Sequence, residues 1–200
     1  MGWMRTRPAA VIASLAASSL LLTACGSSGH AHRSAHVPRP THVIDRAHGI
    51  SFDLARGWHR ASMNLTPHLA DPREVLSAGT FVPRYRRTAC AQAPGSALEQ
   101  LRAGGAFVTV QERGRGSAGG FPRRPKHFGP NLGGPADFHS CVPGAHYLDH
   151  WFAFADGGRH FNVDVAFGPR ASRVTQSQAW GLLDSLTVDP RVRPSWRSSP

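Results

Sequence analysis

The sequence predicts an α+β domain in which a mostly antiparallel sheet of about six strands packs with two helices and carries one disulfide. Apolar residues at every second position, as in residues 161–167, indicate half-buried strands. A Gly-Gly pair between two aromatic-rich segments indicates an antiparallel hairpin. Two segments with helix-start residues indicate the helices. A chain of 200 residues has room for one such domain.

The domain is expected to begin near Gly49 with a strand over residues 50–54, where apolar and polar residues alternate. Gly57 turns the chain out of this strand. A second strand is expected over residues 74–82 and ends before Pro83, because proline cannot donate to a sheet ladder.

The middle of the domain is predicted to contain a short helix and a strand. Ser96 and Glu99 have the spacing of a capping box, which predicts a helix that ends near Ala103. The apolar residues of 106–112 predict the next strand. Residues 113–136 are rich in Gly and Pro and therefore predict a long surface loop.

The last part of the domain is predicted to contain a strand over 137–142 and then the hairpin. The hairpin arms are residues 147–155 and 160–167, and the glycines between them suit a turn that needs positive φ. Ser172 is expected to cap a final helix that ends near residue 185. We expect the large aromatic residues of the domain to be core rather than ligand platforms: Trp58, Phe128 and Trp180.

Residues 1–24 are interpreted as a lipoprotein signal peptide, since a basic start precedes an apolar run of secretory length. Residues 22–25 read Leu-Thr-Ala-Cys and resemble the lipobox of bacterial lipoproteins. The resemblance implies cleavage after Ala24 and a diacylglycerol thioether on Cys25. Two acyl chains give lasting attachment, which predicts a lipid anchor on the extracytoplasmic face of the cell membrane. An ordinary secretory signal is the alternative interpretation.

Residues 25–48 are predicted to be a flexible tether rich in His, Pro and Ser, and residues 189–200 a disordered tail. Imidazoles in such a tether are candidate ligands for Zn²⁺ or Cu²⁺. The alternative is a solvated segment in which histidine is one more polar residue. The candidate ligands are His30, His32, His36 and His42, with His48 at the end of the tether.

Cys90 and Cys141 remain once Cys25 carries lipid, and two thiols in an exported chain predict one disulfide. A metal site or a reactive thiol is the alternative, although the sequence has no Cys-x-x-Cys spacing.

The formal net charge of +11 does not predict nucleic-acid binding, because an exported chain without interleaved aromatic and basic residues lacks that pattern. The densest basic group of the domain consists of Arg84, Arg86 and Arg87, and a second group consists of Arg123, Arg124 and Lys126. They are candidates for an anionic surface, since guanidinium forks bind phosphate or carboxylate. The alternative is a solvated loop. Anionic lipid head groups or an anionic wall polymer are the expected counterparts of this charge, with solubility as the simpler explanation.

The strand and Gly-Trp pair of residues 49–58, together with the closing helix and the residues 182–188, resemble small secreted domains of the PsbP/Mog1-like type. The chain is also similar to uncharacterised actinobacterial lipoproteins that carry such a domain. The resemblance implies a binding or assembly accessory without chemistry of its own.

We therefore expect a non-enzymatic envelope accessory or binding module, with an envelope protein or an anionic wall polymer as its partner and no cofactor. A metal-binding lipoprotein that uses the tether histidines is the alternative. A hydrolase is disfavoured because no nucleophile, base and acid set is evident. His139, His146 and His150 lie close to Asp149 in sequence and could contribute to a zinc site, but a third ligand and an open position are not identified.

Overall fold

The structure is a computed structural model, and it describes residues 39–87, 94–114, 120–134, 142 and 146–192. Within these ranges the chain forms eight strands and two helices, in the order β1 (Thr41–Asp45), β2 (Ile50–Leu54), β3 (His59–Arg60), β4 (Arg73–Gly79), α1 (Gly95–Gln100), β5 (Ala106–Arg113), β6 (Leu148–Asp156), β7 (Arg159–Phe167), α2 (Arg173–Ser185) and β8 (Thr187–Val188). All of these elements belong to one compact unit. The α+β class is confirmed.

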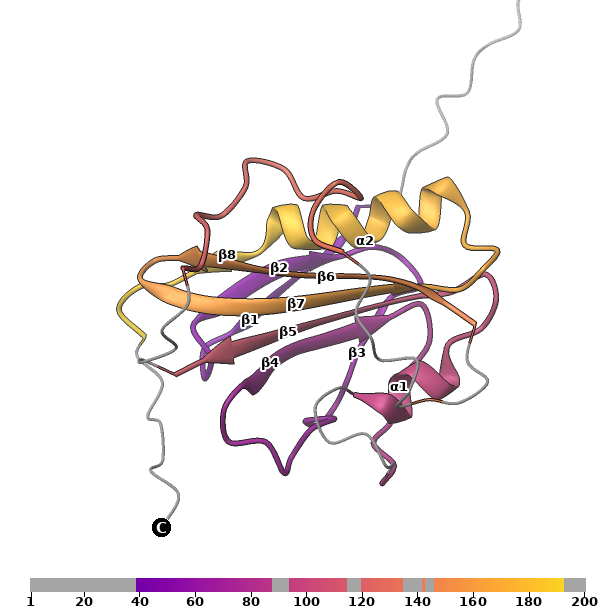
Figure 1. The fold of residues 1–200 in the computed structure, drawn as a ribbon, viewed down its shortest axis with the longest axis horizontal. Helices are drawn as coiled ribbons and strands as arrows, with labels where there is room; N and C mark the ends of the chain where they lie inside the picture. Colours follow the sequence, from indigo (N-terminus) through magenta and orange to yellow (C-terminus); the bar gives the residue numbers. More distant parts are fainter. Residues whose placement is uncertain (1–38, 88–93, 115–119, 135–141, 143–145, 193–200) are drawn as a thin grey trace, which may run out of the picture. The chain divides into compact units, whose positions relative to one another are not determined.

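The strands form two sheets rather than the single sheet of about six strands that the sequence predicts. The smaller sheet has the order β1-β2-β8, and the larger has the order β3-β4-β5-β7-β6. Every pair of neighbouring strands is antiparallel. Figure 1 shows α2 and α1 on opposite sides of the larger sheet.

The main core lies between the first face of the larger sheet, helix α2 and strand β2. Phe154, Phe161 and Val163 of the sheet are fully buried here, as are Phe52 of β2 and Leu183 of α2. The aromatic residues expected in the core are buried as well, namely Trp58, Phe128 and Trp180. Burial of this apolar face is the main contribution that holds the two sheets and the helix together.

The second face of the larger sheet combines a small apolar cluster with buried polar residues. Leu98 of α1 packs there with Phe107 and Ala166 of the sheet. Thr109 and Asp164 are buried next to this cluster and pair across β5 and β7. This face is therefore covered, although its residues do not form an apolar stripe.

The hairpin β6-β7 has the turn that the sequence predicts. Gly157 and Gly158 connect the arms with φ of 57° and 73°, which L side chains rarely adopt. The register joins Asp156 to Arg159 and continues to Leu148 and Phe167. Two positive-φ glycines match the right-handed twist of the strands.

The two helices begin differently. Ser172 is the N-cap of α2, and its side chain accepts a hydrogen bond from Thr175 N, which confirms the prediction. The predicted capping box of the first helix is wrong, because α1 has Pro94 at its N-cap and no side-chain cap hydrogen bond. The Ser96 side chain is instead buried at the start of the helix and cannot reach out to cap it.

Strand β1 lies inside residues 25–48, which the sequence assigned to a flexible tether. Ordered structure therefore begins before the predicted boundary at Gly49, and β1 pairs with β2 over five residues, from Thr41 opposite Leu54 to Asp45 opposite Ile50. The strand is at the edge of its sheet and largely exposed, so its sequence lacks the apolar alternation of a buried strand. Strand β4 is shorter than predicted and ends at Gly79.

The Gly- and Pro-rich loop after β5 covers the outer edge of β6. Its described part contacts that edge at two places, where Arg123 bridges to Ala155 and Gly134 bridges to Trp151. Such cover removes a template for pairing with other chains. The predicted strand over residues 137–142 falls almost entirely outside the described residues. No helix in the described ranges is long and apolar enough to cross a membrane.

Candidate functional site

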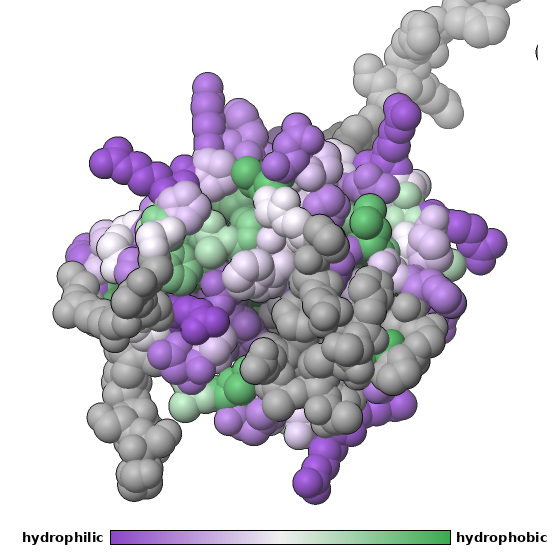
Figure 2. Space-filling model, in the orientation of Figure 1, coloured by the Kyte–Doolittle hydropathy of each residue, from purple (hydrophilic) through white to green (hydrophobic). Residues whose placement is uncertain are grey.

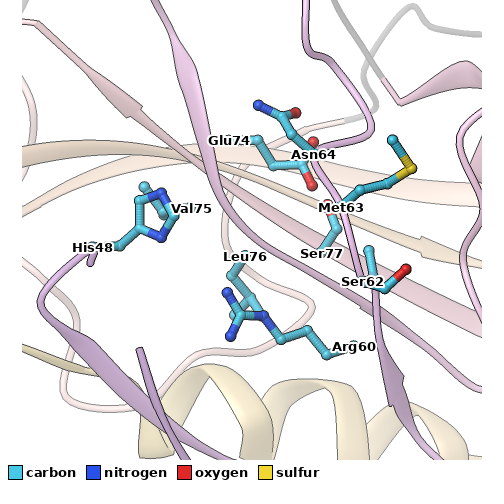
Figure 3. A pocket seen from close by; sticks show the side chains of 10 residues that line it. His48, Arg60, Ser62, Met63, Asn64, Glu74, Val75, Leu76 and Ser77 are labelled. Carbon is cyan, nitrogen blue, oxygen red and sulfur yellow. The ribbon is translucent and has the colours of Figure 1, made fainter. Parts of the chain in front are cut away.

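The candidate site is a pocket at the edge of the larger sheet, where β3 leaves β4. Strand β3 pairs only with Ala78 and Gly79, and the hydrogen bond from Ala61 N to Ser77 O continues this contact by one residue. The chain then moves away from β4 and leaves a cavity of about 500 Å³. A cavity of this size is within the range of small-ligand sites. Figure 3 shows the side chains that line it.

One wall of the pocket comes from the turn between β1 and β2. Asp45 ends β1 and is buried, and its carboxylate accepts hydrogen bonds from His48 N at 3.1 Å and His48 Nδ1 at 2.8 Å. The same carboxylate accepts a hydrogen bond from Arg60 Nη2 of β3. Asp45 thereby fixes both His48 and Arg60, whose side chains line the pocket.

The pKa of Asp45 reflects this arrangement. Burial raises the pKa, but the hydrogen bonds from His48 and Arg60 together outweigh burial and lower the pKa to about 2. The carboxylate is therefore charged at neutral pH, and its charge is shared between two donors that face the pocket. The Arg60 guanidinium keeps further N–H donors for the pocket beside this carboxylate.

The turn that carries His48 is held from the sheet side by a buried ion pair. Arg159 donates to Glu112 from Nε at 2.7 Å and from Nη2 at 2.8 Å, and both side chains are almost completely buried. The same guanidinium donates to His48 O at 2.9 Å and to Gly49 O at 3.3 Å. Arg73 adds a second contact to Glu112 at 2.8 Å. A bidentate arginine fixes geometry as well as charge.

The opposite wall comes from the segment after β3. Glu74 of β4 accepts hydrogen bonds from Leu65 N at 2.8 Å and Thr66 N at 3.1 Å. The Glu74 side chain therefore lies between β4 and this segment and keeps the two backbones apart. Burial raises the pKa of Glu74, while hydrogen bonds from Ser77, Leu65 and Thr66 act in the opposite direction. Glu74 thus serves to keep the pocket open.

Asn64 and Ser62 are exposed on this wall. Asn64 Oδ1 accepts from Thr66 N at 2.7 Å, which leaves the amide nitrogen of Asn64 as a further donor. In Figure 3, His48 enters from one side and Ser62 and Met63 from the other, with Arg60 below. Arg60 and Asn64 offer hydrogen-bond donors to the cavity, and Oε2 of the lining residue Glu74 is engaged by backbone N–H groups. The donors of Arg60 and Asn64 suit a ligand with acceptor groups.

The predicted arginine group lies elsewhere. Arg84, Arg86 and Arg87 are exposed in the segment after β4, and none of them forms an ion pair with a described residue. Arg124, which was expected to support them, instead donates to Leu183 O at 3.0 Å and Asp184 O at 3.1 Å at the end of α2. A cation at a helix C-terminus is a structural contact.

The predicted metal ligands are brought together in no described part of the chain. His42 lies on β1 and contacts Asp53 Oδ1 through Nδ1 at 2.7 Å, whereas His30, His32 and His36 lie outside the described residues. His150 packs its ring against Trp180 with centroids 5.4 Å apart, and His146 is exposed. Burial lowers the pKa of His150, while Asp149 acts in the opposite direction. In the described ranges, no group of three or more His, Cys, Asp or Glu side chains could hold a metal.

Cys25, Cys90, Cys141 and His139 also lie outside the described residues, so the lipid and disulfide predictions stay predictions. Six large apolar side chains are exposed among the described residues: Ile44, Met63, Val82, Leu148, Trp151 and Val174. On the face that Figure 2 shows, apolar surface is interspersed with hydrophilic residues.

Sequence reasoning missed the residues that build the pocket. Asp45 and His48 were placed in a tether, and Arg60 belongs to a strand of two residues that has no recognisable pattern. The short Asp-x-x-His spacing before a glycine was the one available signal. No protein-family profile matches the chain, and no curated protein matches its sequence.

Proposed function

We propose that the protein is a lipid-anchored binding module on the extracytoplasmic face of the cell membrane and that its pocket takes a negatively charged, acceptor-rich group of an envelope component. An anionic wall polymer fits this description. The observation that carries the proposal is the convergence of Arg60 and His48 on one cavity, both fixed by Asp45. Arg60 retains Nε and Nη1 for a ligand, because its hydrogen bond to Asp45 uses Nη2.

The anchor is part of the proposal and rests on the lipobox-like residues that end in Cys25. A disulfide between Cys90 and Cys141 belongs to the same proposal, since an exported chain meets oxidising conditions. The domain would serve as a PsbP/Mog1-like binding accessory rather than as an enzyme.

The pocket offers a test through one conservative substitution. Asn64→Asp keeps the side-chain oxygen that accepts from Thr66 N, so the local turn is retained. The substitution adds a negative charge to the wall of the pocket. One unfavourable interaction of about 1 kcal/mol corresponds to roughly a fivefold to tenfold loss of affinity for an anion.

We would titrate the chain that starts at Cys25 by calorimetry at low salt with two probes. Glycerol 3-phosphate tests a phosphate group, and glutarate tests carboxylate groups. The wild type is expected to bind at least one of the two probes. Asn64→Asp is expected to weaken that binding, whereas Asn131→Asp, an exposed change outside the pocket, should have no effect. The proposal would be contradicted if Asn64→Asp and Asn131→Asp bound the probe with equal affinity, or if the wild type bound neither probe.

A metal-binding function through the tether histidines is the second candidate. Its support is the density of imidazoles at residues 30–36. His42 contributes less to this candidate than the sequence suggests, because its ring is engaged by Asp53 on the surface of the smaller sheet. Titration with Zn²⁺ before and after deletion of residues 30–36 distinguishes the two functions, since anion binding in the pocket does not need that segment.

A further inference from the structure

The second face of the larger sheet carries a buried polar row that the proposed function does not use. Ser77, Thr109 and Asp164 are directly opposite one another across β4, β5 and β7. Gln111 and Asn162 form the next pair along β5 and β7 on the same face. All five side chains are at least nine-tenths buried.

Two of these side chains have polar atoms without a partner. Both carboxyl oxygens of Asp164 and the Nε2 atom of Gln111 are buried and have no hydrogen bond. The residues are diagonal neighbours, since Thr109 is opposite Asp164 and Gln111 is opposite Asn162. Buried polar groups in folded proteins are satisfied in more than nine cases of ten, so this pair points to an occupant.

A second carboxyl lies beside Asp164. Asp149 of β6 is 2% exposed and is on the same face, because it is opposite Ala166, two residues from Asp164. The Asp149 carboxyl therefore lies diagonally across β6 and β7 from the two unpartnered oxygens of Asp164. No hydrogen bond in the described structure satisfies these two oxygens, whereas a bound cation would.

The ligand atoms that side chains present on this face are oxygen atoms. Asp149 and Asp164 supply carboxylates, and Gln111 and Asn162 supply amide oxygens, with the Gln111 oxygen in place of Nε2 once the amide is turned. His150, the nearest nitrogen ligand on β6, is on the opposite face of the strand, where it contacts Trp180. Carboxylate and amide oxygens are the ligands of Ca²⁺, whereas Zn²⁺ prefers nitrogen and sulfur.

We propose that Asp164 and Asp149, together with Gln111 and Asn162, bind one Ca²⁺ ion on the second face of the larger sheet. The inference is independent of the anion pocket, which lies at the outer edge of β4. An ion there joins β5, β7 and β6 and satisfies the buried carboxyl oxygens of Asp164.

Trp151 gives a direct readout, because it is opposite Asp164 in the register of β6 and β7. The chain that starts at Cys25, freed of metal by chelation, would be titrated with Tb³⁺ at neutral pH under excitation of indole. Sensitised emission that Ca²⁺ displaces is expected. Trp151→Phe should lower this emission several-fold, but it should leave intact the rise in melting temperature that Ca²⁺ causes.

Asp164→Asn should weaken Ca²⁺ binding at least tenfold, and Glu99→Gln, at an exposed carboxylate of α1, is the matched control without effect. If Asp164→Asn fails to fold, the proposal is tested by comparing the melting temperature of the wild type in Ca²⁺ with its melting temperature in chelator. Equal melting temperatures in the two conditions, or Ca²⁺ binding unchanged in Asp164→Asn, would overturn the proposal.

Discussion

Asp45 connects the acid–base properties of the chain to its candidate site. One buried carboxylate holds both His48 and Arg60, so its charge sets the orientation of two ligand-binding side chains. Hydrogen bonds to charged groups contribute more than neutral ones. The position of Asp45 at the end of β1 also links the smaller sheet to β3 of the larger sheet.

Asp45→Asn is expected to destabilise the fold by about 2 kcal/mol at neutral pH, because charged hydrogen bonds are lost. The wild-type pKa of about 2 is below that of an unfolded aspartate. The stabilisation is therefore full above roughly pH 4 and is lost as the pH falls toward 2. Urea unfolding at pH 7, 4 and 2.5 checks this, and a constant difference between wild type and variant at all three values would contradict it.

The Glu112–Arg159 ion pair joins three parts of the fold. Arg159 of β7 contacts Glu112 of β5 and also donates to the β1–β2 turn. Arg159→Met leaves Glu112 buried with only Arg73 as partner, and removal of one member of a buried pair costs roughly 3–5 kcal/mol. The double variant with Glu112→Leu is expected to lose less than Arg159→Met alone, since no buried carboxylate is then left without Arg159. Denaturant unfolding measures both, and a double variant that is the less stable of the two would contradict the buried-pair interpretation.

Helix α2 offers a matched pair of substitutions. Ser172→Ala removes the side chain that accepts from Thr175 N, so we expect a loss of about 1 kcal/mol in unfolding free energy. Ser177→Ala, at an exposed position inside the same helix, should be neutral or slightly stabilising because alanine favours helix interiors. Equal effects of the two changes in thermal unfolding would show that Ser172 has no capping role.

The elements that could be predicted are those whose local sequence decides their structure. Apolar residues at alternate positions predicted β2, β5 and β7. The glycine pair between the two aromatic-rich segments predicted the β6-β7 hairpin, and Ser172 predicted the start of α2. Strands β1, β3 and β8 are short or exposed and form because of partners distant in sequence. Local periodicity carries little information about such strands.

The candidate site was harder to predict for the same reason. Its ion pairs join residues far apart in sequence, such as Glu112 and Arg159, and the sequence alone gives no pairing. The exposed arginines 84–87 were the densest basic group by composition. The structure instead favours Arg60, which a buried carboxylate fixes, and only the fold shows that these two residues meet.

We propose a membrane anchor at Cys25 and a folded binding domain that follows it along the chain. Strand β1 begins at Thr41, sixteen residues beyond Cys25. A chain of that length spans at most about 58 Å, so an anchor at Cys25 would hold the start of the domain within that distance of the membrane surface. Such a distance suits a ligand that belongs to the envelope.

Cys25→Ser is expected to move the protein from the membrane fraction to the soluble exported fraction, since no acyl chain can be attached. Fractionation of cells that express each form checks this, with mass spectrometry of the mature N-terminus. Wild-type protein without lipid, or a variant that stays in the membrane fraction, would contradict the anchor.

The central claim is that the pocket between β4 and the β1–β2 turn binds a negatively charged group. The most direct test is a nitrogen-15 NMR titration of the chain from Cys25 with glycerol 3-phosphate and glutarate. The account predicts that the largest amide shifts occur at His48, Arg60 and Asn64 and saturate together. Shifts confined to arginines 84–87, or no saturable shifts with either anion, would contradict it.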